Sequence, residues 1–80
     1  MNNSLIPLSQ LPLGKSARVR ELTADGSSRR RMLDLGIIID THVEALQKSP
    51  SGDPTAYHIR GAVFALRSEE ASKIYVEAMQ

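Results

Sequence analysis

Three short apolar segments that end in turns lie in the middle of this 80-residue chain. They span residues 43–47, 56–60 and 62–66. The first two are joined by a loop with two prolines and a glycine, and the last two by Gly61, and these residue types favour chain reversal. Successive reversals place neighbouring strands side by side. The sequence therefore predicts a three-stranded antiparallel meander as the centre of the fold.

Short elements on both sides of the meander complete the pattern. Residues 17–22 alternate small or apolar with polar side chains, which is typical of a half-buried strand. Residues 29–35 predict a helix of about two turns, capped by Ser27 or Ser28 and ended by Gly36 in a left-handed conformation.

The C-terminal and N-terminal parts of the chain add smaller elements. Ser68 caps a short turn over residues 68–71, and residues 74–76 alternate as a last strand. Residues 5–13 are apolar with two prolines, which indicates a covering segment with one short helical turn.

Five short strands with one short helix after the first strand cannot form a two-sheet sandwich of ordinary size, and they suit a small, strongly bent barrel. An open sheet with one helix and an OB-like barrel are the alternatives. We expect a mainly β single domain over residues 1–80, with its core at about 5–77. The residues predicted to form the barrel core are Val19, Val43, Ile59, Val63 and Leu66.

The composition argues against several functional classes. Without cysteine, the chain has no disulfide, iron–sulfur cluster, cysteine-based zinc knuckle or catalytic thiol. No nucleophile elbow, HExxH zinc motif or phosphate-binding glycine loop occurs, so we do not expect an enzyme. A net charge of +1 and three aromatic residues give little basis for nucleic-acid binding. The start of the chain has no basic leader and no long apolar run, so we expect a cytoplasmic protein.

The hairpin offers one candidate metal site. A register that pairs Val43 with Ile59 places three potential ligands on its outward side, where they suit a weak site for a divalent transition metal such as Fe²⁺ or Zn²⁺. The alternative is an exposed cross-strand ion pair, because Arg60, which this register places opposite the first ligand, repels a cation. The candidate ligands are His42, Glu44 and His58.

An ordered set of short motifs resembles the ferrous iron transport protein A (FeoA) family, over about residues 5–77. The motifs lie at residues 30–37, 41–43, 49–54, 57–61, 65–71 and 74–76. The resemblance implies an SH3-like β-barrel and a small cytoplasmic accessory protein of bacterial ferrous iron uptake. It also implies a partner, the cytoplasmic GTPase domain of ferrous iron transport protein B, through which alone the chain would reach the membrane. One departure is Asp40, which stands where the family usually has glycine.

The apolar run after the predicted helix is the candidate partner-binding surface. Three successive isoleucines at positions 37–39 cannot all face inward if the backbone is extended, so at least one is expected at the surface. An exposed apolar patch beside arginines suits a protein partner. The alternatives are simple core filling for the apolar residues and a solvated helix face, with one arginine paired to Asp34, for the basic ones. The candidate partner-binding residues are Arg30, Arg31, Leu35, Ile38 and Ile39.

Two functions from different classes follow. The first is an accessory module that binds the transporter and modulates iron uptake. The second is a sensor or carrier that binds a transition metal directly through the three candidate ligands.

Overall fold

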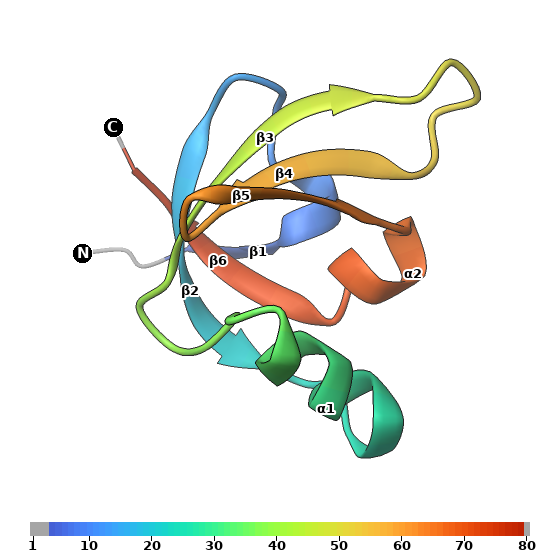
Figure 1. The fold of residues 1–80 in the computed structure, drawn as a ribbon. Helices are drawn as coiled ribbons and strands as arrows, with labels where there is room; N and C mark the ends of the chain where they lie inside the picture. The colour runs from blue at the N-terminus through green and yellow to red at the C-terminus, as the bar shows by residue number, and fades with distance from the viewer. Residues whose placement is uncertain (1–3, 80) are drawn as a thin grey trace.

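The computed structural model describes residues 4–79, which form one six-stranded antiparallel sheet with two short helices (Figure 1). The strand order is β1-β6-β2-β3-β4-β5. The elements are β1 (Leu5–Pro7), a 3-10 turn η1 (Leu8–Gln10), β2 (Ser16–Leu22), α1 (Gly26–Asp34), β3 (His42–Lys48), β4 (Thr55–Ile59), β5 (Ala62–Leu66), α2 (Ser68–Ala71) and β6 (Ile74–Ala78).

The mainly β fold predicted from the sequence is confirmed, and so is the meander of β3, β4 and β5. The sheet is strongly bent, but the edge strands β1 and β5 each pair with one neighbour, so the barrel stays open between them. The short helical turn expected between the two prolines is η1. Strand β1, which pairs with the C-terminal strand β6, was not predicted, because three residues ending in proline give no alternating pattern.

Helix α1 ends as the sequence predicts but begins elsewhere. Gly36 has φ +86°, and its N–H donates to the Leu33 carbonyl at 3.0 Å while the Ile37 N–H donates to the Met32 carbonyl at 2.9 Å. This pair of bonds is a Schellman motif, which satisfies the last carbonyls of the helix. The predicted serine caps are wrong: the helix starts at Gly26, and the residue before it occupies the N-cap without a side-chain bond.

The core lies between the inner faces of the bent sheet. Val19, Val43, Ile59 and Leu66 are fully buried, as predicted. Val63, also predicted to be core, is 60% exposed. The other buried hydrophobic residues are Leu8, Leu11, Ala17, Ala24, Met32, Ile37, Ala45, Tyr57, Ala71, Ile74 and Val76.

The register of β4 and β5 explains the error at Val63. It pairs Val63 with His58, so the two side chains lie on the outward face. The neighbouring pair of Tyr57 and Phe64 lies on the inner face, where the Tyr57 hydroxyl donates to the Leu8 carbonyl at 3.4 Å. Burial raises the pKa of the Tyr57 phenol, which is therefore a neutral core group.

We expect Ile59→Ala to lower the free energy of unfolding by about 2–4 kcal/mol, because it removes a fully buried side chain and leaves a cavity. Val63→Ala is the matched control on the next strand, and it should cost less than about 0.5 kcal/mol because the side chain is mostly in solvent. Urea unfolding followed by circular dichroism measures both. Equal losses for the two variants would contradict the burial described here.

Candidate functional site

The loop between α1 and β3, residues 35–41, holds two exposed isoleucines in a fixed backbone. Ile37 is fully buried, whereas Ile38 and Ile39 are 46% and 50% exposed. The buried Thr41 hydroxyl accepts a hydrogen bond from the Ile38 N–H at 3.0 Å and donates one to the Gly36 carbonyl at 3.3 Å. Ile37 thus anchors the loop in the core, and the next two side chains are presented to solvent.

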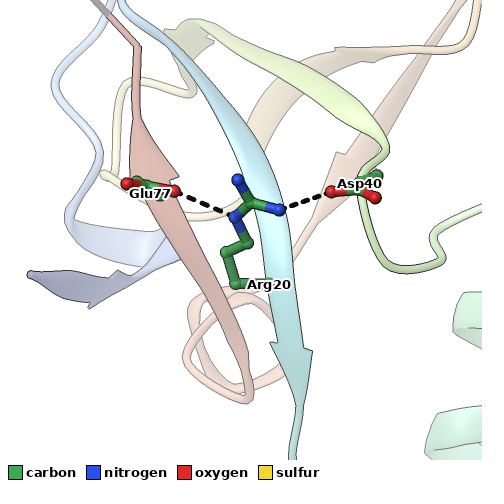
Figure 2. A network of polar contacts seen from close by, with 3 residues as sticks. All are labelled: Arg20, Asp40 and Glu77. Carbon is green, nitrogen blue, oxygen red and sulfur yellow. Dashed lines mark hydrogen bonds and ion pairs between the residues drawn. The ribbon is translucent and has the colours of Figure 1, made fainter. Parts of the chain in front are cut away.

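Arg20 fixes the far end of this loop (Figure 2). It lies at a β-bulge in β2, between the residues that pair regularly with β6. From there its Nη1 donates to Asp40 Oδ1 at 2.5 Å and its Nε to Glu77 Oε1 at 2.9 Å. All three side chains are at least a third exposed, so each ion pair contributes little to stability on its own, but together they orient the loop.

Asp40 departs from the family pattern without distorting the turn. Its φ is +75°, a left-handed conformation that aspartate tolerates better than most residues. Its N–H donates to the Val19 carbonyl at 2.7 Å, and its carboxylate binds Arg20. A glycine at this position would keep the turn and lose the ion pair.

The three arginines of α1 point to different places. Arg31 Nε donates to Glu70 Oε2 at 2.8 Å and ties α1 to α2, whereas Arg29 Nη1 donates to the Leu22 carbonyl at 3.4 Å. Arg30 is exposed, and no ion pair between it and Asp34 is found in residues 4–79, which corrects that expectation. The candidate partner surface therefore has one arginine held by an acidic partner and one that extends freely.

The apolar part of the candidate surface differs slightly from the prediction. Leu35 is half-buried and packs against the core. Leu33 is 46% exposed and lies three residues after Arg30, on the same side of the helix. We call the predicted set Arg30, Arg31, Leu35, Ile38 and Ile39 the Ile38 surface.

Arg60 belongs beside this surface rather than beside the candidate metal ligands. The regular pairing of β3 with β4 ends at Val43 and Ile59, so Arg60 lies in the following turn and not opposite His42. A Cβ atom built on Gly36 would lie 2.7 Å from Arg60 Cδ, so the stem of Arg60 lies directly against that glycine. No local pattern in the sequence indicates this contact.

The candidate metal ligands are only partly brought together. Glu44 and His58 are paired across β3 and β4, as predicted, but the cross-strand neighbour of His42 on β2 is Arg18. Within residues 4–79, no group of three or more histidine, aspartate or glutamate side chains is arranged to hold a metal ion. The positive charge of Arg18 beside His42 also opposes the binding of a metal ion there.

Comparison with known families and proteins identifies the chain. A model described as the FeoA domain matches residues 6–78. The chain belongs to the FeoA domain family. A curated relative of this FeoA domain is the Fe(2+) transport protein A/Fe(2+) transporter FeoB fusion protein of Porphyromonas gingivalis, 34% identical over 70 residues. The match covers 88% of this chain and 8% of that protein, so the chain spans a small part of its relative.

Solved structures of the family share the fold. The FeoA-like protein of Clostridium acetobutylicum is 31% identical with a TM-score of 0.90, over 100% of this chain and 92% of that one. Stenotrophomonas maltophilia FeoA complexed with zinc, described as a prokaryotic SH3 domain protein, is 35% identical with a TM-score of 0.74, over 88% of this chain and 87% of that one. These likenesses confirm the predicted SH3-like FeoA fold. None of the described helices has the length and apolar character needed to cross a membrane.

We expect Gly36→Ala to be more destabilising than Gly14→Ala, although both glycines have similar positive φ angles of +86° and +84°. Each alanine incurs about 1–2 kcal/mol of backbone strain in the left-handed region. Only the new Cβ at Gly36 meets a neighbour, Arg60, which adds about 1 kcal/mol. Urea unfolding measures the loss of stability for both variants. When Arg60→Ala is combined with each of them, the additional loss caused by Gly36→Ala should vanish. Equal losses for the two single variants would contradict the contact.

Proposed function

We propose that this chain is a cytoplasmic accessory protein of ferrous iron uptake that binds the GTPase domain of ferrous iron transport protein B and modulates transport. The observation that carries the proposal is the Porphyromonas gingivalis relative, in which an Fe(2+) transport protein A and an Fe(2+) transporter are fused in one chain. Fusion keeps two domains at high effective concentration, which is useful when they act on one another. A separate chain must reach the same partner through a docking surface.

The Ile38 surface suits that docking role. Ile38 and Ile39 are nearly half-exposed, and the loop that carries them is held by Thr41 and by the Arg20 network. A preorganised loop loses little conformational entropy when a partner covers it. The two exposed isoleucines would form the apolar centre of the contact, with Arg30 and Arg31 at its rim.

Modulation by such a module requires a preference between states of the partner. A bound protein shifts the conformational equilibrium of a transporter only by its difference in affinity for two conformations. The proposal therefore gives this chain a binding role, and the chemistry of GTP hydrolysis belongs to the partner. The expected readout is a change in GTP turnover that saturates with the concentration of this chain.

We expect Ile38→Asp to raise the Kd for the full-length transporter in nanodiscs by about 100-fold or more, because a carboxylate without a partner is costly to bury in an apolar contact. Leu13→Asp is the matched control: Leu13 is 47% exposed, against 46% for Ile38, and it lies outside the 35–41 loop, next to Gly14, whose N–H donates to the Ala45 carbonyl in the middle of β3. Biolayer interferometry measures both, after circular dichroism confirms folding. Wild-type binding by folded Ile38→Asp would place the docking surface elsewhere.

A direct metal-binding role is the second candidate function. It is favoured by the zinc complex of the Stenotrophomonas maltophilia relative and by the cross-strand pair of Glu44 and His58. An imidazole and a carboxylate suit a divalent transition metal such as Zn²⁺ or Fe²⁺. Two partly exposed ligands, with His42 beside a cation, would leave such an ion largely hydrated.

For this second role we expect Zn²⁺ to bind no more tightly than tens of micromolar, on the order of −6 kcal/mol, in isothermal titration calorimetry. The double variant His42→Ala, His58→Ala should abolish the heat of Zn²⁺ binding. Arg18→Gln should instead tighten binding, because it removes the cation opposite His42. Stoichiometric submicromolar binding by the wild-type chain would favour the sensor or carrier over the accessory module.

A further inference from the structure

Helix α1 is held to the rest of the molecule by few contacts. It lies outside the bent sheet (Figure 1), and of its residues 26–34, all of which the structure describes, only Met32 is buried. The other side chains of the helix are exposed, except that of Ser28, which is half-buried. A helix of nine residues is too short to be stable in water without packing. The helix therefore depends on Met32 and on its polar contacts for its position.

Two side-chain hydrogen bonds link α1 to its neighbours. Arg31 Nε donates to Glu70 Oε2 at 2.8 Å, and Arg29 Nη1 donates to the Leu22 carbonyl at 3.4 Å. Both partners of the first bond, an ion pair, are partly exposed to solvent, so the pair adds little stability. The second bond is longer than the usual range for an N–H donor. Together with Met32, the ion pair of Arg31 is the main attachment of the helix.

The N-terminal turn of α1 is weak in itself. Asp25 occupies the N-cap position without a side-chain hydrogen bond, and the first turn contains no acidic residue. The Arg29 N–H donates to the Asp25 carbonyl, but at 3.4 Å. Both a side-chain cap and an acidic first turn normally stabilise the start of a helix. The turns of α1 are therefore easier to lose than those of a capped helix.

Both ends of this segment are anchored in the body of the protein. Before α1, the Thr23 N–H and Oγ1 both donate to the Lys73 carbonyl, at 2.8 and 2.9 Å, and Ala24 is buried. After α1, Ile37 is fully buried. We call residues 25–36, between these anchors, the α1 segment. It can open while the strands on either side of it keep their places.

A cleft between α1 and the end of β5 separates the helix from this edge of the sheet. Its volume is about 460 Å³, and its lining residues are Ser28, Arg31, Pro54, Ala65, Arg67, Glu69 and Glu70. The helix therefore has no continuous apolar face against β5. Opening of the α1 segment would break the packing of a single buried side chain, which is typical of regions that unfold locally.

We propose that the α1 segment opens as one unit while the sheet stays folded, and that Met32 and the ion pair of Arg31 with Glu70 hold it closed. The open state exposes Met32 and removes one wall of the cleft beside β5. Because α1 also carries Arg30 and Arg31, opening would remove part of the Ile38 surface. That consequence rests on the docking role proposed above, whereas the opening itself does not.

Hydrogen exchange of the isolated full chain in urea, followed by NMR, tests the opening. Below the unfolding transition, the exchange rates of the amides of residues 30–36 should stay within about twofold of their values in water, because local opening exposes little surface. Amides of β3 and β4 that need global unfolding should exchange faster with each addition of urea. The same urea dependence in both groups would show that α1 opens only when the whole chain unfolds, and would overturn the proposal.

Two neighbouring arginines provide a matched pair of variants. Arg31→Gln removes the ion pair with Glu70 and should speed exchange in residues 30–36 about two- to fivefold, with no change in β3. Arg30→Gln changes an exposed arginine for which residues 4–79 show no ion pair, and it should leave these rates unchanged. Equal effects of the two variants would contradict the role given to the ion pair.

Peroxide oxidation tests the role of Met32. Its sulfur takes an oxygen atom from hydrogen peroxide, with release of water, and the sulfoxide formed is polar. Met79 is 38% exposed and gives the reference rate, against which oxidation of the buried Met32 should be about tenfold slower or more. Mass spectrometry of the tryptic peptides 32–48 and 74–80 separates the two sites.

Once Met32 is oxidised, residues 30–36 should exchange about tenfold faster or more, because the polar sulfoxide does not return to the buried site. A sample oxidised only at Met79 is the control and should exchange as the untreated chain does. Unchanged exchange after oxidation of Met32, or oxidation of Met32 as fast as that of Met79, would overturn the proposal.

Discussion

Two backbone hydrogen bonds between β2 and the 35–41 loop hold the proposed docking surface in place. The Val19 N–H donates to the Thr41 carbonyl at 2.9 Å, and the Val19 carbonyl accepts the Asp40 N–H at 2.7 Å. Val19 is itself fully buried and pairs with Val76 on the next strand. Because Val19 belongs to the core, the loop is attached to a fully buried part of the sheet.

The bulge that follows Val19 adds a second attachment, through the side chain of Arg20. Arg20 occupies the irregular position in β2, where it bridges Asp40 and Glu77 (Figure 2). Bulges re-aim side chains and are common beside functional sites. The loop is held by backbone bonds, a buried threonine and this ion-pair network. The side chains of Ile38 and Ile39 are therefore held at the surface. Their exposure is a property of the fold.

The parts of the fold predicted from sequence are those that depend on local patterns. Turn residues located the meander, and the glycine after α1 located the helix end, because each acts through its own backbone. Val63 was misassigned since alternation alone cannot say which of the two faces of an edge strand is covered. The bulge at Arg20 and the contact of Arg60 with Gly36 join segments far apart in sequence, and no local pattern encodes them.

Hydrogen–deuterium exchange on the chain bound to full-length transporter in nanodiscs tests the central claim, that the 35–41 loop is the docking surface. The account predicts slower amide exchange in residues 35–41 and no change in residues 13–16, beside the middle of β3, or in residues 46–48, at its far end. Unchanged exchange in residues 35–41 of a complex that is demonstrably formed, or protection confined to the far end, would contradict it.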